Sequence, residues 1–569
     1  MREIVTIQVG GFANFVGSHF WNFQDELLGL AGDPKSDPVF KNQHVNMDVL
    51  YRSGETHQGI LTYTPRLVSF GFQGSLGTMN SRGTLYSNDS STATSVPTWS
   101  GNVSTHISEP RKKNLFLRSL YEEEGVGDGT VSAVDHSNQE IEDSEIVSSL
   151  EKNVEYWTDF SKVHYHPRSL YEINGLWVDA QESDHTGFGR DAYSGDREED
   201  INERLRFFIE ECDHIQGIQF LVDDSGCFSG LSADFLEHMA DEYSNTPVLL
   251  YRVKGNNSTD QSLSLKRVVS RDLHESISFA RLSQFCKLIV PLGVPTFNIG
   301  KAFSYIRVNN EKAYHNSAVY AAALHAISLP FRFEEQGPSA NSPCFSGAVD
   351  INGVIQMLAC QGRQNMVATM DAAMPVASVN GKLEKQSLLD NWQCLTPQVD
   401  DDTEDLYALE HTSIHGVRNS AGRYALASEV EDAVNSYYKN ALTTPFFSHI
   451  SVTQCPLPIP LPFPSIFSDR IGQYGELLDT PISGSSSRGS LDVSSIPMAA
   501  RLRSTSAILP FLESRLSNLK RFGLGHGALG SELVRSWGYG REELEEMGET
   551  LTKLIGTLDP HSQASSDAE

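Results

Sequence analysis

The chain has 569 residues and a formal net charge of −29, from 44 basic and 73 acidic side chains. This length exceeds what one compact core supports, so we expect two or three domains. The acidic excess argues against nucleic acid and anionic lipid as main partners, because both require clustered Lys and Arg. No apolar run approaches the roughly 20 residues of a membrane span, so we expect no membrane-spanning segment.

The cysteines and the first residues indicate a compartment. Seven cysteines are scattered along the chain without a C-x-x-C pair, which is typical of reduced thiols in a cytosolic protein. The first five residues, MREIV, have neither the apolar core of a signal peptide nor the Arg-rich character of a transit peptide. We therefore expect a cytoplasmic protein.

Two strand–glycine–helix units stand out. Residues 1–9 predict a strand that leads through Gly10 and Gly11 into a helix at 14–28. Residues 217–222 predict a second strand, followed by a turn at 225–230 and a helix at 231–243. Backbone N–H groups in such turns can face a phosphate, although most such turns only connect elements. The acids Asp223 and Asp224 argue against a polyphosphate there, and G-x-G-x-x-G is absent.

The remaining elements alternate between helices and apolar strands. Strands are predicted at 248–253 and 287–291, and helices at 202–215, 273–285, 314–331, 426–441 and 544–558. This alternation predicts a mostly parallel sheet covered on both faces. The helix at 314–331 is apolar nearly all round and must be buried. The helix at 544–558 could bind a partner or a membrane interface, but its acidic first turn suits a helix N-terminus better.

Several segments are predicted to be irregular. Residues 80–150 and 179–200 are rich in Ser, Gly and acids, so we interpret them as mobile insertions with one ordered patch near 115–121. The proline-rich segment 456–464 must be extended, either as an SH3-type ligand or packed along the protein's own surface. Residues 481–495 predict a flexible linker, and the acidic run 400–405 a solvated loop.

The opening sequence, MREIVTIQVGGFANFVGSHFW, resembles the first residues of tubulin. The segments YTPR with GTM, KVHY and ECDHIQG, at 63–79, 162–165 and 211–217, resemble further tubulin segments in the same order. The likeness covers about the first 245 residues, and long inserts and a foreign C-terminal half follow. This combination, with VHYHPRSLYEINGLW at 163–177, resembles the Misato (DML1-type) family of divergent tubulin-like proteins.

The resemblance implies an α/β fold of the tubulin/FtsZ type. A parallel-sheet, nucleotide-type domain with disordered inserts would span residues 1–300. A core helix would join it to a second α+β domain at 301–480, followed by a linker at 481–500 and a helical region at 501–569.

The resemblance also implies a vestigial nucleotide pocket formed by Gly10, Gly11, Asn14, Ser225, Gly226, Ser229 and Gly230. Its loops depart from the tubulin pattern. Gly11 and Phe15 replace two polar contacts, Phe228 stands in a turn that is one residue shorter, and residues 71–74 lack carboxylates. Val163 replaces a loop glycine. Since a hydrogen bond to a charged group contributes roughly 1.5–3 kcal/mol, three losses weaken binding by on the order of 10³-fold.

Hydrolysis is not expected. Tubulins complete a neighbouring subunit's active site with an acid just after the core helix, but residues 337–343 contain none. Glu334 and Glu335 lie on the wrong side of the glycine. We therefore expect no catalytic residue, no enzymatic activity and no bound cofactor, with weak GTP binding left open. His164 and His166 could be two metal ligands, but no nearby set completes a site, so no metal is expected.

Family membership would imply a non-enzymatic protein that acts in mitochondrial distribution, morphology and inheritance. Such a protein would be cytoplasmic, would associate with mitochondria, and would contact protein partners, among them mitochondrial surface proteins, tubulin or chaperonin. Two alternatives remain open at this point. One is a nucleotide-dependent polymerising GTPase with a remodelled pocket. The other is a tubulin-biogenesis or spindle assembly factor.

Overall fold

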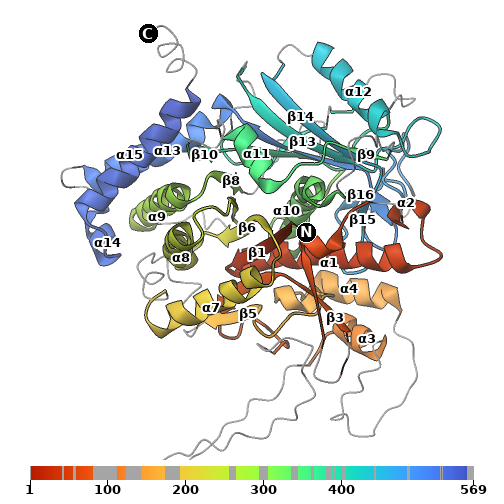
Figure 1. Cartoon of the computed structure of the whole chain (residues 1–569), viewed down its shortest axis with the longest axis horizontal. Helices are drawn as coiled ribbons and strands as arrows, with labels where there is room; N and C mark the ends of the chain where they lie inside the picture. The colour runs from red at the N-terminus through yellow and green to blue at the C-terminus, as the bar shows by residue number, and fades with distance from the viewer. Residues whose placement is uncertain are drawn as a thin grey trace, which may run out of the picture.

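The structure is a computed structural model of the whole chain. It describes residues 2–41, 44–55, 59, 61–80, 112–123, 142–173, 193–255, 264–293, 305–334, 344–359, 364–379, 388–389, 391–399, 405, 407–440, 444–483, 487–525, 527 and 529–559. Figure 1 shows two sheets with helices between and around them, and a group of C-terminal helices at one side.

A parallel sheet forms the first half of the molecule. Its seven described strands run in the order β10-β8-β7-β6-β1-β4-β5, and every ladder between neighbours is parallel. The strands are β1 (Glu3–Val9), β4 (Leu67–Phe72), β5 (Leu170–Ile173), β6 (Ile215–Asp223), β7 (Val248–Val253), β8 (Leu288–Leu292) and β10 (Met366–Val367). β1 and β4 are buried along their whole length, as expected for strands covered on both faces. The predicted parallel sheet is confirmed.

Helices cover both faces of this sheet. Figure 1 looks nearly along the strands, with one helix layer on each side. One layer contains α7 (Asp196–Glu210), α8 (Phe228–Glu242) and α9 (Leu265–Phe285), and the other α1 (Gly11–Gly32) and α10 (Ala313–Ser328). Almost every residue of α10 is buried, because α10 also packs against the second sheet. It is the core helix that the apolar sequence predicted.

The second sheet is mixed and lies beyond α10. Its six described strands run in the order β12-β11-β19-β13-β14-β9, and only β13 and β14 are parallel to each other. They are β9 (Phe345–Ser346), β11 (Thr369–Ala373), β12 (Gln393–Cys394), β13 (Leu409–His415), β14 (Phe447–Thr453) and β19 (Met498–Ser504). Helix α12 (Ala427–Asn440) covers one face, and α11 (Ile351–Leu358) packs between the two sheets.

Three further helices close the C-terminal side. They are α13 (Leu509–Asn518), α14 (Ser531–Ser536) and α15 (Arg541–Leu558), and a π-helical turn (Leu519–Leu524) follows α13. The apolar residues Leu544, Leu551 and Leu554 of α15 are buried, and α15 packs on α9 and α13. The face that sequence alone left open to a partner or a membrane is therefore covered by this chain itself.

Several shorter elements complete the described structure. They are α2 (Pro38–Lys41), the hairpin β2 (Tyr51–Glu55) and β3 (Leu61–Pro65), and the short pairs β15 (Leu457–Pro458) with β18 (Ser495–Ile496) and β16 (Phe467–Ser468) with β17 (Ser487–Arg488). Short 3-10 turns lie at Met47–Val49, Trp157–Phe160, Leu329–Arg332 and Ser506–Ile508.

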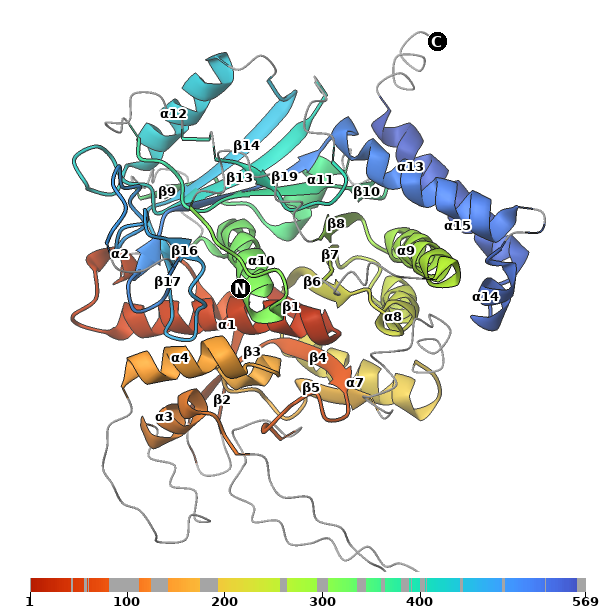
Figure 2. The ribbon, with the colours of Figure 1, turned by 180° about the vertical axis from the view of Figure 1, so that it is seen from behind.

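The insertion at 80–150 contains more order than predicted. The patch near 115–121 is a helix, α3 (Leu115–Glu123), but the sequence analysis missed α4 (Asp143–Asn153). Ile146 and Leu150 of α4 pack with α3 against Phe160, so this acidic helix has an apolar face. Figure 2 shows α4 alongside α1, with α3 on the far side of α4. Similarly, the last residues of the insertion predicted at 179–200 begin α7. Residues 81–111, 124–141 and 179–192 of the two insertions lie outside the described residues.

The predicted linker and the boundary behind it are wrong for the residues described. Arg488 is buried and donates to the carbonyl oxygens of Ile471 and Asp492, while Val493 is fully buried. Strand β19 then runs through the boundary predicted at 500 and lies between β11 and β13. The Gly and Ser content of 483–490 suggested flexibility, but Arg488 and Val493 anchor the described residues from 487 onward.

The proline-rich segment 456–464 packs on the protein's own surface. Leu457, Ile459 and Phe463 are buried in the main core, and β15 within it pairs with β18. The alternative of a free SH3-type ligand is thereby contradicted.

Of the acidic run 400–405, only Asp405 is described, and it accepts hydrogen bonds from Thr505 Oγ1 and Ser506 N.

Several element boundaries also differ from prediction. α1 begins three residues earlier than the predicted 14, and α9 begins eight residues earlier than 273. The helix predicted at 202–215 ends at Glu210, because β6 already starts at Ile215. α10 ends at Ser328, where Pro330 follows in a 3-10 turn.

Candidate functional site

The two glycine turns lie at the same edge of the first sheet. β1 and β6 are parallel neighbours with Val9 opposite Val222, so Gly10 and Asp223 follow side by side. Gly10 has φ 101° and ψ 165°, a conformation that essentially only glycine adopts. A Cβ atom at Gly10 would lie 2.7 Å from the Cβ of Asp223, so the close approach also requires glycine.

The carboxylate of Asp223 occupies the point where the backbone amides of the two turns converge. Its Oδ2 accepts from Phe12 N at 2.9 Å, and its Oδ1 accepts from Ser225 N at 3.1 Å. Phe12 is the second residue of α1, so the carboxylate also lies at the positive end of that helix. Asp223 is 6% exposed. An acidic side chain of the protein itself therefore already binds backbone amides of both turns.

Burial and hydrogen bonding act on this carboxylate in opposite directions. Burial raises the pKa of Asp223 above its usual range, and the hydrogen bonds from Phe12 and Ser225 oppose that rise. Both oxygens act as acceptors, which is the pattern of an ionised carboxylate. From the sequence, Asp223 was expected only to repel a polyphosphate. Its role as hydrogen-bond acceptor for Phe12 N and Ser225 N was missed.

Aromatic rings fill the space around the two turns. The rings of Phe72 and Phe228 have centroids 4.5 Å apart, and Phe228 lies 3.1 Å from the position of a Cβ at Gly10. Phe12 meets Tyr320 of the core helix edge-on, with centroids 6.0 Å apart. All four rings are buried. The turns are thus packed from within by apolar side chains.

The structure brings Gly10, Gly11, Ser225 and Gly226 together but commits Asn14 elsewhere. Gly11 opens α1, and a Cβ there would meet no atom within 4 Å. Asn14 is 1% exposed; its Nδ2 donates to Phe70 O at 2.9 Å and its Oδ1 accepts from Ser69 Oγ at 2.9 Å. Asn14 therefore ties α1 to β4.

The remaining predicted residues belong to the start of α8. Ser229 Oγ donates to Gly226 O at 3.1 Å, and Gly230 is buried inside the helix. Because α8 begins at Phe228, the open turn is shorter than the predicted 225–230. Ser229 is therefore engaged within its own turn.

The other loops that align with tubulin are also engaged internally. Lys162 forms ion pairs with Asp25 at 3.2 Å and Glu26 at 2.6 Å, both on α1. Gly74 N donates to Glu172 Oε1 at 2.9 Å. Residues 337–343, where tubulins carry the hydrolytic acid, lie outside the described residues.

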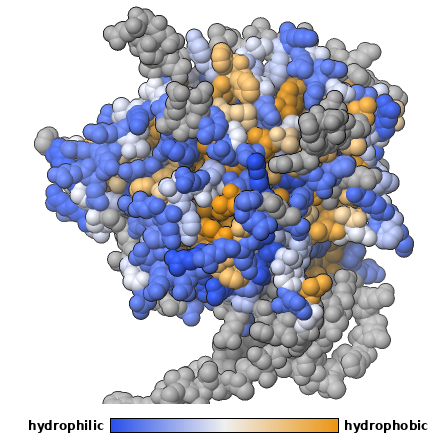
Figure 3. Space-filling model, viewed as in Figure 1, coloured by the Kyte–Doolittle hydropathy of each residue, from blue (hydrophilic) through white to orange (hydrophobic). Residues whose placement is uncertain are grey.

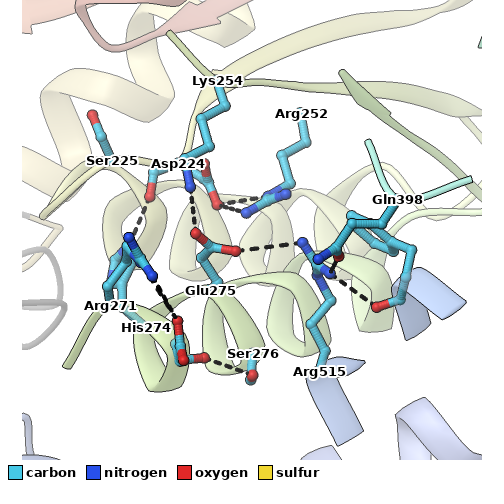
Figure 4. A network of polar contacts seen from close by, with 12 residues as sticks. Asp224, Ser225, Arg252, Lys254, Arg271, His274, Glu275, Ser276, Gln398 and Arg515 are labelled. Carbon is cyan, nitrogen blue, oxygen red and sulfur yellow. Dashed lines mark hydrogen bonds and ion pairs between the residues drawn. The ribbon is translucent and has the colours of Figure 1, made fainter. Parts of the chain in front are cut away.

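A network of charged side chains, several of them buried, extends from the second turn toward the C-terminal helices (Figure 4). Arg252 on β7 donates from Nε to Asp224 Oδ2 at 2.6 Å, and both side chains are almost fully buried. Lys254 pairs with Glu275 on α9. Glu275 in turn pairs with Arg515 on α13 at 3.4 Å. The network joins the carboxyl edge of the sheet to α13.

The charges of this network shift each other's titration. Burial alone would raise the pKa of Glu275, but Lys254, Arg252 and Arg515 lower it to about 2. Burial and the neighbouring Arg252 lower the pKa of Arg515 to about 9. No signal in the sequence pointed to this network, since its members are separated by up to 291 positions, from Asp224 to Arg515.

Of the two histidines considered as metal ligands, His166 packs against an aromatic side chain. His166 stacks on Phe207 with centroids 4.9 Å apart, and burial together with Arg52 and Arg168 lowers its pKa to about 4. Across the described ranges, no group of three or more His, Cys, Asp or Glu side chains is placed to hold a metal ion. The described helices also include none that is long and apolar enough to cross a bilayer.

Comparisons with known proteins agree with this architecture. Residues 2–122 match the family model of the Misato Segment II tubulin-like domain, and residues 147–333 match that of the Tubulin domain. Protein misato homolog 1 of Mus musculus is 29% identical to the chain over 583 residues, which cover 97% of each sequence. Protein misato homolog 1 of Homo sapiens is 31% identical over 407 residues, 68% of this chain and 67% of that one.

A fungal protein extends the same relationship. Protein DML1 of Gibberella zeae is 27% identical over 379 residues, which cover 66% of this chain and 68% of that one. The two matched family models fall on the parallel sheet, its inserts and the core helix. The chain therefore belongs to the Misato family of tubulin-like proteins.

Proposed function

We propose that this chain is a non-enzymatic tubulin-like protein that acts in mitochondrial distribution, morphology and inheritance. It would work in the cytoplasm in association with mitochondria, as a scaffold that contacts protein partners. Family membership supports the cellular role, which the resemblance to Misato proteins implies. The non-enzymatic part rests on one observation: the carboxylate of Asp223 holds the amides of Phe12 and Ser225.

Electrostatics explains why this carboxylate opposes nucleotide binding. A phosphate that approaches Asp223 to about 4 Å meets a repulsion of roughly 4 kcal/mol at an effective dielectric constant near 20. Each 1.4 kcal/mol is about tenfold in affinity, so this repulsion alone weakens binding by on the order of 10³-fold. The phosphate would also need the two N–H groups that Asp223 already holds.

A rescue experiment in depleted cells tests the proposal. The variant Gly11→Asp places a second carboxylate at the first turn of α1, where a Cβ meets no neighbour and where an acid suits the helix dipole. A scaffold that needs no nucleotide restores mitochondrial networks as well as wild type does. Gly11→Asn, which has the same shape without the charge, is the matched control.

The outcomes separate the two halves of the proposal. Normal mitochondrial networks after depletion would refute the cellular role, whatever the pocket does. Rescue by Gly11→Asn but not by Gly11→Asp would refute the non-enzymatic role and favour a nucleotide-dependent polymerising GTPase. Co-purification with chaperonin and tubulin, without any mitochondrial fraction, would favour a role in tubulin biogenesis or spindle assembly.

A further inference from the structure

The second sheet contains a strand, β14, whose second side is paired only at one end. β13 pairs with all seven residues of β14, whereas β9 pairs only with Val452 and Thr453 at its far end. The burial of the residues agrees with this pairing. Six of the seven residues of β13 are buried, but only the last three of β14 are. Within the described part of the chain, the first half of β14 is thus an edge.

The hydrogen-bond pattern shows which backbone groups face outward. Phe447 N donates to Ala408 O, and Gly416 N donates to Thr453 O, so residues 447, 449, 451 and 453 face β13. By alternation, the backbone groups of Ser448 and Ile450 point to the other side. The carbonyl of Ile450 lies close to Gly347. Ser448 therefore offers both an N–H and a C=O at the edge, next to the N–H of Ile450.

Exposed aromatic side chains gather at the same place. Tyr407, Phe446 and Phe447 are 60%, 74% and 43% exposed, although aromatic side chains of this size are usually covered. Ala408 O accepts from the backbone nitrogens of both Phe446 and Phe447, so the three residues are neighbours. Figure 3 shows hydrophobic side chains reaching the surface over the second sheet, in the upper part of a mostly hydrophilic face.

We infer that the first half of β14 is a docking edge for an extended, non-acidic segment of a partner protein. The segment would add to the sheet as a further strand, with backbone hydrogen bonds to Ser448 and Ile450. Its apolar side chains would cover Phe446 and Phe447, which begin this strand. This surface is independent of the glycine turns, so the inference does not depend on how the nucleotide pocket behaves.

Charge decides between a partner protein and a second copy of this chain. Two copies would each bring a net charge of −29 to the contact and would repel each other. The acids of helix α12 lie away from this edge, since Glu431 accepts from Ser346 Oγ beside the paired end of β14 and Glu429 pairs with Arg423. A neutral or basic segment complements the negative net charge of the whole chain, whereas an acidic segment or the same chain does not.

A synthetic peptide tests the edge directly. The probe is a strand-forming peptide of about eight residues that alternates valine with threonine and ends in lysine at both sides. Fluorescence anisotropy measures its binding to the full chain, and hydrogen exchange reports the amides of Ser448 and Ile450. We expect saturable binding and slower exchange of these two amides. Phe446→Ser with Phe447→Ser should weaken binding by roughly tenfold or more.

Two further variants complete the test. Ser448→Pro removes the outward N–H without breaking a bond to β13, and Pro is tolerated on edge strands, so it should abolish binding in a folded protein. Tyr474→Ser removes an aromatic side chain that is 40% exposed elsewhere, and should bind as wild type does. The unfolding midpoint of each variant shows whether it remains folded.

Four results would overturn the inference. They are no binding to wild type, equal binding by Ser448→Pro, equal binding of a peptide with glutamate in place of lysine, and a dimer in sedimentation that Ser448→Pro dissolves. The last result would assign the edge to a second copy of the chain.

Discussion

The carboxylate of Asp223 lies 2.9 Å from the backbone nitrogen of Phe12, although 211 positions separate the two residues. This contact joins the end of β6 to the first turn of α1, the two elements that carry the glycine turns. It engages a backbone amide at the N-terminus of α1 in a hydrogen bond within the protein. The consequences for stability and for ligand binding can be measured separately.

Replacing the acceptor should create a site for a small anion. Asp223→Ala leaves the amides of Phe12 and Ser225 without their acceptor, which should lower the free energy of unfolding by about 1–3 kcal/mol. Sulfate or phosphate should then stabilise the variant in a concentration-dependent way, because it binds only the folded state. Urea unfolding with and without sulfate checks both effects.

The control for this variant is Asp33→Ala, which changes an exposed acid at the other end of α1. It should cost little stability and should respond to sulfate as wild type does. An equal response of Asp33→Ala and Asp223→Ala would show that the anion acts on the protein in general and not at the vacated carboxylate.

The first glycine turn should tolerate a methyl group at Gly11 but not at Gly10. Gly10→Ala combines a backbone conformation reserved for glycine with a Cβ only 2.7 Å from that of Asp223. We expect a loss of at least about 1–3 kcal/mol. Gly11→Ala lies in the helix with open space around its Cβ and should be neutral or slightly stabilising. Similar unfolding midpoints for both variants would contradict the packing described for this turn.

The elements of the fold could be predicted from the sequence where a short stretch of residues determines them. β7 was predicted at its observed bounds, because a short apolar run between polar segments suffices to mark a buried parallel strand. The start of α1 was placed too late, because two successive glycines suggest a turn although Gly11 is already helical. α4 was missed because acids and serines outweigh Ile146, Val147 and Leu150 in its composition.

Among the predicted pocket residues, too, only the features determined by neighbouring residues in the sequence could be predicted. Gly10 and Gly226 each have a positive φ within their own turn, a local conformation that a glycine in a strand–helix turn indicates in the sequence. The partners of Asn14 and Asp223 lie on other strands or helices, so their engagement was invisible to local patterns. The same holds for Arg515 and Glu275, which meet only because α13 packs on α9.

Buried neutral histidines should make the protein sensitive to mild acid. Burial lowers the pKa of His19, His411 and His415 to about 3, and that of His325 well below its usual value. The unfolded chain takes up protons on these side chains below about pH 6.5 while the folded protein does not. Stability is therefore fully present above pH 6.5 and falls as the pH decreases, by up to about 1.4 kcal/mol per pH unit for each histidine.

Unfolding by urea between pH 7 and pH 5 measures this slope. The lowered pKa values of Glu151 and Glu275, about 2, affect stability only below about pH 4.5, and so leave this window to the histidines. The raised pKa of Asp223 acts in the opposite sense, because the folded protein takes up this proton at a higher pH than the unfolded chain does. His411→Asn should reduce the number of protons taken up on unfolding by about one, and so lower the slope of the unfolding free energy against pH. A stability that does not change between pH 7 and pH 5 would contradict the burial of these neutral rings.

The ion pair between Glu275 and Arg515 should hold the C-terminal helices on the sheet. Arg515→Ala removes this pair and the bond to Gln398 Oε1 at 2.5 Å, and leaves Glu275 with Lys254 alone. Breaking a buried pair typically costs about 3–5 kcal/mol. Hydrogen exchange should show α13 and α15 opening more often than the strands of the first sheet.

A solvent-exposed ion pair on α15 serves as the control for the loss of stability in Arg515→Ala. Arg541 and Glu545 pair at 2.8 Å on α15, with side chains 66% and 50% exposed. Arg541→Ala should change stability by less than about 1 kcal/mol, since solvent and salt screen exposed charges. Equal losses in Arg515→Ala and Arg541→Ala would show that burial does not strengthen the network of Figure 4.

The nucleotide content of the freshly purified, full-length protein tests the central claim most directly. Acid extraction followed by chromatography gives the moles of guanine nucleotide per mole of chain. Because Asp223 holds the amides of Phe12 and Ser225, the account predicts far less than one nucleotide per chain, with no increase after incubation with excess GTP. One tightly retained GTP or GDP per chain would contradict it.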